Sequence, residues 1–237
     1  MSDEFDRATE YDVELEQGLR LSGEHKDYFA AGRIRLLLRL LPGTDGPGAV
    51  LDFGCGVGDT TVLLQETFPE ARIVGTDTAD GALELARLRH GDRRARFLRP
   101  ESIGDEEQFD LVYVNGVFHH IRPEDRGAAL TWIVRRLVPG GRIALFENNP
   151  WNPGARWVMR RIPFDRDAEM LSVQVAEALL REAGLEVVFT RSLFWFPRWL
   201  SWLRPLERRL EPVPLGAQYL VLARRGTRSG SDVGRLT

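Results

Sequence analysis

The apolar and polar positions of this chain follow two patterns, which take turns along the sequence. Short apolar runs with β-branched residues are typical of buried strands. We predict such strands over residues 50–53, 71–76, 96–99, 109–114 and 141–146, with two more over 186–190 and 218–223. Segments with helical periodicity and helix start and stop signals lie between them. We predict helices over residues 24–41, 59–67, 80–89, 123–136 and 173–183. Strand and helix therefore alternate, which predicts an α/β fold with a doubly wound, mostly parallel sheet and helices on both faces.

Local signals set the ends of these helices. Pro42 ends the first helix, and Pro123 suits the first turn of another. Asp80 and Ser172 are expected to cap the helices that follow them, and Gly184 is expected at a helix end.

One domain is expected from the length of 237 residues. We expect an N-terminal arm and cap helix over 1–44, the main domain over 45–225 and a disordered tail over 226–237. Two insertions, 148–170 and 193–216, are expected to form substrate loops, because Pro, Asn and Trp gather there.

The most informative local feature is a glycine turn after the first strand. Gly54, Gly56 and Gly58 let the backbone bend sharply and let a ligand lie against it, because no Cβ intervenes. The second strand ends on Asp77, where a carboxylate is placed to bind both hydroxyls of an adenosine ribose. The glycine turn and Asp77 together predict a cofactor that contains adenosine.

Two acids beside the turn bear on which cofactor this is. A dinucleotide fingerprint would have a small residue where this chain has Asp59. A carboxylate there would repel pyrophosphate, and Asp52 adds a second one nearby. Neither acid disfavours a cationic cofactor without phosphate, so the electrostatics favour S-adenosylmethionine over NAD.

Four blocks of the sequence resemble the motifs of class I S-adenosylmethionine-dependent methyltransferases. The blocks are Val50–Gly58, Ile73–Asp77, Phe109–Ile121 and Leu137–Leu145. The resemblance covers residues 49–225. It implies a Rossmann-like sheet of seven strands with an antiparallel last strand, and transfer of a methyl group from S-adenosyl-L-methionine that leaves S-adenosyl-L-homocysteine.

The resemblance also implies which residues surround the cofactor. The backbone of the turn would border its methionine and ribose, a pair of residues after the third strand and one after the second would meet the adenine, and the end of the fourth strand would face its amino-acid part. An aromatic residue of the N-terminal helix would cover it. With the two acids, the predicted set is Tyr28, Asp52, Gly54, Cys55, Gly56, Asp59, Asp77, Thr78, Glu101, Ser102, Asn115 and Gly116. Glu101-Ser102 replaces the Asp-Ala pair that is usual in the family.

Two adjacent histidines are the candidates for catalysis. A neutral imidazole at His119 or His120 could remove a proton from an acceptor hydroxyl. The alternative is a structural histidine that packs against the sheet. Glu147 is interpreted as a buried hydrogen-bond anchor, ahead of a second base. Four histidines and one cysteine form no ligand cluster, so no metal is expected.

The segment around Trp195, Trp199 and Trp202 is unusually aromatic, and these three residues have α-helical spacing. Three interpretations stay open: a lid over a hydrophobic substrate, a core or dimer surface, and contact with a membrane or a lipid-linked substrate.

Composition narrows the partners. The net charge of −3 gives no basic surface for nucleic acid, and a single cysteine, Cys55, permits no internal disulfide. No signal peptide or membrane span is expected, so the predicted location is the cytoplasm. We expect a methyltransferase for a small molecule, with O-methylation favoured slightly. The alternatives are a non-catalytic S-adenosylmethionine-binding protein or accessory subunit and, less favoured, an NAD-linked oxidoreductase. A homodimer is left open.

Overall fold

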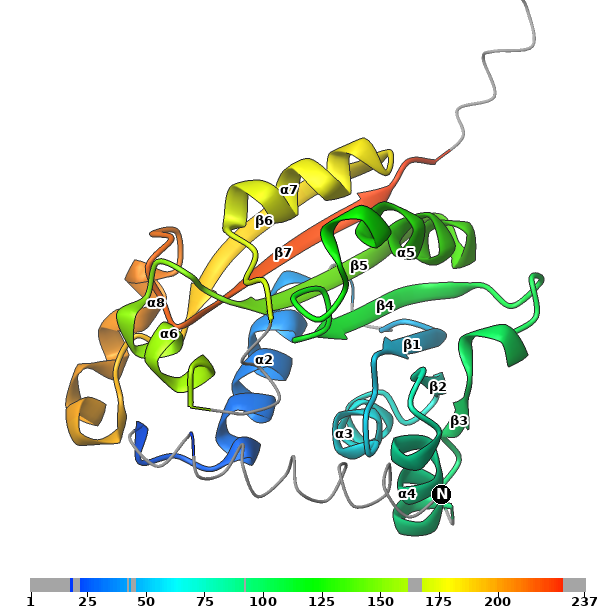
Figure 1. Ribbon diagram of the computed structural model, residues 1–237, viewed down its shortest axis with the longest axis horizontal. Coiled ribbons are helices and arrows are strands. Elements are labelled where there is room, and N and C mark those ends of the chain that lie inside the picture. The colour runs from blue at the N-terminus through cyan, green and yellow to red at the C-terminus, as the bar shows by residue number, and fades with distance from the viewer. Residues whose placement is uncertain are drawn as a thin grey trace, which may run out of the picture.

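A seven-stranded sheet organises the part of the chain that the computed structural model describes, which is residues 18, 22–41, 43, 46–91, 93–161 and 168–227 (Figure 1). Its strands are β1 (Ala49–Phe53), β2 (Arg72–Thr76), β3 (Arg96–Leu98), β4 (Phe109–Asn115), β5 (Leu137–Asn148), β6 (Leu185–Leu193) and β7 (Gln218–Arg225). Their order is β3-β2-β1-β4-β5-β7-β6. The pairs from β3 to β5 are parallel, and β7 is antiparallel to both of its neighbours. The predicted Rossmann-like fold, mostly parallel with an antiparallel last strand, is confirmed.

Helices cover both faces of the sheet. The larger ones are α2 (Lys26–Leu40), α3 (Asp59–Thr67), α4 (Asp80–His90), α5 (Pro123–Arg136) and α7 (Val173–Glu182). The shorter ones are η2 (Pro100–Ser102), α6 (Pro153–Met159), η4 (Arg198–Leu206) and α8 (Glu207–Leu210). Helices α2, α3 and α4 lie on one face, and α5 and α7 lie on the other (Figure 1).

The two cores follow from the period of two along each strand. On β4, Leu111 and Tyr113 belong to the core under α2, α3 and α4, whereas Val112 and Val114 belong to the core under α5 and α7. All four side chains are almost completely buried. A central strand that is apolar on both faces is what a doubly covered parallel sheet requires.

Most predicted boundaries agree with the structure, and two differ for clear reasons. Strand β5 begins at Leu137, four residues earlier than predicted, because Leu137 pairs with Phe109 ahead of an irregularity in the β4–β5 register. Ser172 caps α7 as predicted, since its side chain accepts a hydrogen bond from Val175 N. Asp80 does not cap α4: it is the first residue of that helix, and it forms an ion pair with Arg99.

The aromatic segment also differs from its predicted geometry. Pro197 precedes η4, a 3₁₀ helix, so the α-helical spacing of the three tryptophans does not apply. Trp195 lies before this helix and is half-buried, while Trp199 and Trp202 are 72% and 73% exposed. The interpretation of these two indoles as core residues is therefore wrong.

Several domain predictions fall on residues outside the description. These are most of the arm over 1–23, most of the tail over 226–237 and part of the insertion over 148–170. Within the described ranges, no helix has both the length and the apolar character that a bilayer span needs.

Candidate active site

The glycine turn joins β1 to α3 at the carboxyl end of the sheet. Gly54, Gly56 and Gly58 have φ angles of +76°, +53° and +88°, which lie in the region that favours glycine. The amides of Gly54 and Cys55 both donate to the carbonyl oxygen of Thr76, at 2.8 and 3.0 Å. The turn is therefore held against the end of β2, next to Asp77.

The first two glycines of the turn meet different surroundings. A Cβ built on Gly54 would lie 2.3 Å from a methyl carbon of Val117, in the loop after β4. A Cβ built on Gly56 would meet no atom of the described residues within 4 Å. Gly54 is needed for packing between two loops, whereas the backbone of Gly56 faces open space that a ligand could fill.

Asp77 is fixed by the turn itself. One carboxylate oxygen accepts the amide of Gly56 at 2.9 Å, and the other accepts the amide of Ala79 at 2.9 Å. Two such bonds, one to each oxygen, fix the plane of the carboxylate. Thr78 follows it and is exposed, and its contact with an adenine stays a prediction.

The negative charge of Asp52 and Asp59 is the basis for preferring one cofactor over the other in the sequence. In the structure, this charge is partly offset by the surroundings of the two acids. Asp52 is 2% exposed and accepts a hydrogen bond from Thr61 Oγ1 at 2.6 Å. Burial raises the pKa of Asp52 to about 7, although the Thr61 bond opposes the rise. Asp59 forms an ion pair with Lys26 at 2.7 Å. The place of both acids at the turn stands, but their joint repulsion of a pyrophosphate is weaker than predicted.

Cys55 lies in the turn with its side chain buried. Burial raises the pKa of its thiol well above the usual value, and Asp52 adds to the effect. A thiol held in the neutral form is a packing group, not a nucleophile.

Helix α2 presents Arg33, not Tyr28, to the carboxyl end of the sheet. Arg33 is 7% exposed, and its guanidinium donates to Tyr113 Oη at 3.2 Å and to Gln218 Oε1 at 3.1 Å. Tyr28 instead packs against Phe194, with ring centroids 5.8 Å apart. Residues five apart on an α-helix point about 140° apart, so Tyr28 and Arg33 lie on different sides of α2. The signal that was missed is an arginine within an apolar helix face.

Glu101 and Ser102 lie in η2, directly after β3. Both side chains are exposed, and Glu101 contacts Arg99 at 3.3 Å. A groove of about 610 Å³ runs between this turn and α5, and Glu101 lines it together with Trp132. The structure places the pair at the predicted edge of the sheet, and its contact with an adenine stays a prediction.

The loop after β4 holds the second part of the site. Asn115 ends the strand, and the Gly116 amide donates to the carbonyl oxygen of Phe146 at 2.9 Å. Of the two histidines that follow, His119 is 4% exposed and His120 is exposed. The histidines therefore have different surroundings although their rings are only 4.1 Å apart.

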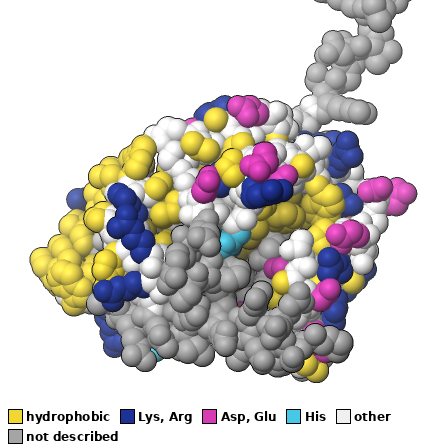
Figure 2. Space-filling view, in the orientation of Figure 1, with side chains coloured by type: hydrophobic (Ala, Val, Ile, Leu, Met, Phe, Trp, Pro, Cys, Tyr) yellow, Lys and Arg dark blue, Asp and Glu magenta, His cyan; other side chains and the backbone are white. Residues whose placement is uncertain are grey.

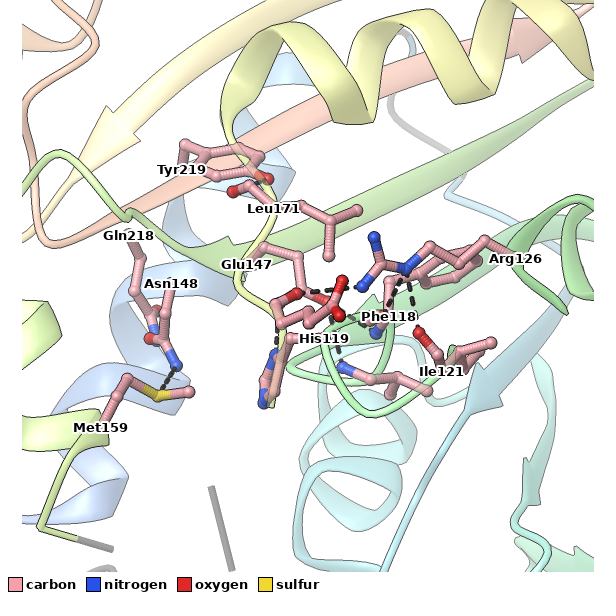
Figure 3. A network of polar contacts seen from close by, with 12 residues as sticks. Phe118, His119, Ile121, Arg126, Glu147, Asn148, Met159, Leu171, Gln218 and Tyr219 are labelled. Carbon is pink, nitrogen blue, oxygen red and sulfur yellow. Dashed lines mark hydrogen bonds and ion pairs between the residues drawn. The ribbon is translucent and has the colours of Figure 1, made fainter. Parts of the chain in front are cut away.

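Glu147, near the end of β5, binds this loop. One carboxylate oxygen accepts the amides of Val117 and Phe118, at 3.1 and 2.7 Å. The other lies 2.6 Å from Nδ1 of His119 (Figure 3). Glu147 is 1% exposed, and its interpretation as a buried anchor is confirmed. In Figure 3 the far edge of the His119 ring, which carries Nε2, points away from this carboxylate.

Arg126 and Glu169 hold the loop from its other side. The Arg126 guanidinium donates to the carbonyl oxygens of Phe118, Ile121 and Glu169, at 3.0 to 3.1 Å (Figure 3). The Glu169 amide donates to the carbonyl oxygen of His119 at 3.0 Å. The end of the 148–170 insertion therefore crosses directly beside the histidine.

Comparisons with known proteins agree with this arrangement. A family model described as a methyltransferase domain matches residues 51–143, which include the turn and the loop after β4. The trans-aconitate 2-methyltransferase of Methylobacterium nodulans is 35% identical over 198 residues, which are 75% of this chain and 76% of that protein. The chain belongs to the S-adenosylmethionine-dependent methyltransferases.

Other members of the family are more distant. The demethylmenaquinone methyltransferase of Thermus thermophilus is 32% identical over 125 residues, which are 51% of this chain and 56% of that protein. A methyltransferase structure from Archaeoglobus fulgidus has a TM-score of 0.65 at 14% identity and covers 87% of this chain and 97% of its own. One from Thermotoga maritima, described as a possible histamine N-methyltransferase, has a TM-score of 0.61 at 21% identity and covers 89% and 99%. These two structures show the fold.

As a methyltransferase, the protein uses S-adenosylmethionine, and the NAD alternative is excluded. The residues of the turn fit this cofactor, because among the described residues Gly56 leaves room beside its backbone and the carboxylate of Asp77 is fixed next to it by the Gly56 amide. In the described part of the chain, no three His, Cys, Asp or Glu side chains are grouped to hold a metal ion.

The two glycines offer a matched test of the turn. Gly54→Ala puts a methyl group against Val117 as well as in an unfavourable φ region, so it should lower the free energy of unfolding by about 3 kcal/mol. Gly56→Ala carries only the backbone cost of about 1–2 kcal/mol, but it should weaken S-adenosylmethionine binding. Urea unfolding and calorimetric titration measure the two effects. Equal losses of stability in both variants would contradict the role of Val117.

Asp52 should make stability depend on pH. Its pKa is raised to about 7 in the folded state, so from about pH 4 to 7 the folded chain holds a proton that the unfolded chain has released. Its contribution to stability is therefore greatest below about pH 4 and is lost as the pH rises through 7. Asp52→Asn still offers an oxygen to Thr61 but does not ionise. The free energy of unfolding of Asp52→Asn, measured relative to that of wild type, should therefore rise by about 3 kcal/mol from pH 5 to pH 8.

Urea unfolding of both proteins at the two pH values measures this gain, because titrations elsewhere in the chain cancel in the difference. A constant difference between the proteins would show that Asp52 titrates like an exposed aspartate.

Proposed function

We propose that this methyltransferase methylates an oxygen of a small-molecule acceptor, with His119 as the general base. The contact between His119 Nδ1 and Glu147 carries the proposal. An ionised carboxylate only accepts hydrogen bonds, so the Nδ1 atom carries the proton and donates it. The lone pair of the neutral ring is then on Nε2, which makes this atom the proton acceptor.

The reaction follows from this tautomer. S-adenosylmethionine supplies a methyl carbon bound to a sulfonium, which an oxygen nucleophile attacks in line. As the oxygen–carbon bond forms and the carbon–sulfur bond breaks, the acceptor hydroxyl gives its proton to Nε2 of His119. Glu147 stabilises the imidazolium that results, because the two groups are buried and 2.6 Å apart. His120 is exposed, whereas His119 is buried against Glu147, so we place His120 beside the reaction and not in it.

The cofactor would be held by the predicted set of residues around the turn. Asp77 would bind the ribose hydroxyls, the backbone of Gly54, Cys55 and Gly56 would border the ribose and methionine, and Asn115 with Gly116 would meet the amino-acid part. The fixed carboxylate of Asp77 and the open side of Gly56 support this. The contacts of Tyr28 with Phe194 do not support its place in the set.

Two insertions, 148–170 and 193–216, would form the acceptor side of the pocket. Two hydrogen bonds from the side chain of Asn149, to the carbonyl oxygens of Pro214 and Gly216, tie them together at 2.9 Å. Asn152 adds a third, to the carbonyl oxygen of Leu215 at 2.9 Å. This joint wall stands next to His119, because Glu169 pairs with the backbone of that residue. The N-terminal helix α2 would complete the enclosure.

A carboxylate is the second candidate for the acceptor group. Proteins described as trans-aconitate 2-methyltransferases recur among the relatives, including the one from Methylobacterium nodulans. A carboxylate is already ionised near neutral pH and needs no base. The two acceptors therefore differ in how strongly turnover depends on His119.

Replacement of the histidines distinguishes these possibilities. His119→Gln should lower kcat for a hydroxyl acceptor by about 100-fold, because it removes the base. The same change should leave S-adenosylmethionine affinity nearly unaltered and abolish the fall of kcat at acidic pH. His120→Gln, the matched control, should retain wild-type turnover.

Release of S-adenosylhomocysteine, measured over a panel of hydroxylated metabolites and trans-aconitate, gives the rates. Wild-type turnover of a hydroxyl acceptor by His119→Gln would refute the proposed base. Turnover of trans-aconitate that is insensitive to both substitutions would identify the carboxylate as the acceptor.

A further inference from the structure

Two tryptophans stand out on the surface at one end of the molecule. Trp199 and Trp202 of η4 are 72% and 73% exposed, and Leu206 at its end is 43% exposed. Helix η4 has a kink at Leu200, between the two tryptophans, and we call the three exposed side chains the ridge. Figure 2 shows this ridge as the apolar surface at the left edge, where η4 and α8 lie in Figure 1. Indoles this exposed contribute nothing to the core.

The surroundings of the ridge are basic although the whole chain is acidic. Residues 148–161 and 193–216 contain seven arginines and two glutamates, with no lysine or aspartate, in a chain with net charge −3. Both glutamates are engaged within the protein. Glu207 accepts the amides of Trp195 and Phe196, at 3.1 and 3.0 Å, and Glu211 pairs with Arg39. Exposed arginines, among them Arg208 and Arg209, therefore dominate the charge of this end.

The two segments form one surface. Trp151 and Leu215 are 45% and 48% exposed, and the side chain of Asn152 donates to the carbonyl oxygen of Leu215. Exposed apolar side chains with arginines beside them thus extend from η4 to the start of α6. We call this surface, Trp151, Trp199, Trp202, Leu206 and Leu215 with Arg208 and Arg209, the tryptophan face.

We propose that the tryptophan face binds the headgroup region of a bilayer that contains anionic phospholipid. Indole rings combine an apolar body with an N–H donor, which suits the boundary between headgroups and acyl chains. Arginine guanidinium groups bind phosphate, and each basic residue near an anionic surface adds to the attraction.

A second copy of this chain is a poorer occupant of the same face. A two-fold symmetric dimer would bring the arginines of one copy against those of the other. Like charges at such a contact repel, whereas an anionic surface neutralises them. The charge of this face therefore selects the lipid surface.

The face is also rigid enough to bind without refolding. Arg204 forms an ion pair with Glu24 at 2.8 Å, behind the ridge. Phe194, at the start of the segment, has a φ of 60° and packs so closely on α2 that a Cβ at Gly32 would lie 2.5 Å from its ring. A preformed ridge loses little conformational entropy on binding.

Vesicle sedimentation tests the proposal with the intact protein. Wild type should sediment with vesicles of phosphatidylcholine and phosphatidylglycerol, and much less with phosphatidylcholine alone. Trp199→Ala/Trp202→Ala should weaken binding to the anionic vesicles by at least about tenfold. Arg208→Gln/Arg209→Gln should weaken it by about tenfold or more and reduce its dependence on salt. Leu88→Ala, which removes a 70% exposed side chain of α4 at the other end of the molecule, should bind like wild type.

Several outcomes would overturn the proposal. Wild type that stays in the supernatant with anionic vesicles would refute lipid binding, and a tryptophan variant that sediments as well as wild type would refute the role of the two indoles. A wild-type dimer that the tryptophan variant converts to a monomer, with no vesicle binding, would make the face a contact between copies. Circular dichroism checks that the variants fold, and these substitutions change only exposed side chains. The assay needs neither cofactor nor turnover, so its failure leaves the proposed O-methylation untouched.

Discussion

The buried carboxylate of Glu147 is the interaction on which the site depends. An ionised group that is 1% exposed is stable only where donors replace the lost water, and here two amides and the His119 ring do so. The carboxylate belongs to β5, whereas all three donors belong to the loop after β4. The sheet, through Glu147, therefore fixes the position of His119, and it would also fix the tautomer on which the proposed base depends.

A single residue joins this anchor to the cofactor turn. The amide of Val117 donates to Glu147, and its side chain is the group that a Cβ at Gly54 would strike. The turn after β1 and the loop after β4 thus pack against each other at the carboxyl ends of adjacent strands, where ligands of open α/β sheets bind. An error of a few tenths of an ångström in either loop would be transmitted to the other. That coupling would keep the cofactor and the proposed base, His119, in one geometry, on which in-line transfer depends.

The sequence predicted the sheet, its helices and the neighbourhood of the turn, because these follow from periodicity and from glycine at fixed spacings. The predictions from sequence failed where the outcome depends on contacts between residues that the fold brings together or on burial. Asp77 reached the amide of Ala79, so Asp80 was not the cap. The segment after Pro197 forms a 3₁₀ helix and not an α-helix, so the i, i+4, i+7 spacing of the tryptophans does not place them on one face. The altered charge of Asp52 came from burial, and no spacing of residues reveals how much water a fold removes.

Helix α2 contacts both the candidate active site and the segment that carries the exposed tryptophans. One of its faces places Arg33 against Tyr113 at the carboxyl end of the sheet, and another receives the ring of Phe194 at Gly32. A helix packed on both faces moves only together with both neighbours, because close-packed interiors leave no free volume for sliding. The segment with the exposed tryptophans is therefore packed against α2, the helix that also lies on the sheet. The contact between the ring of Phe194 and Gly32 therefore joins the tryptophan segment to the helix that also carries Arg33.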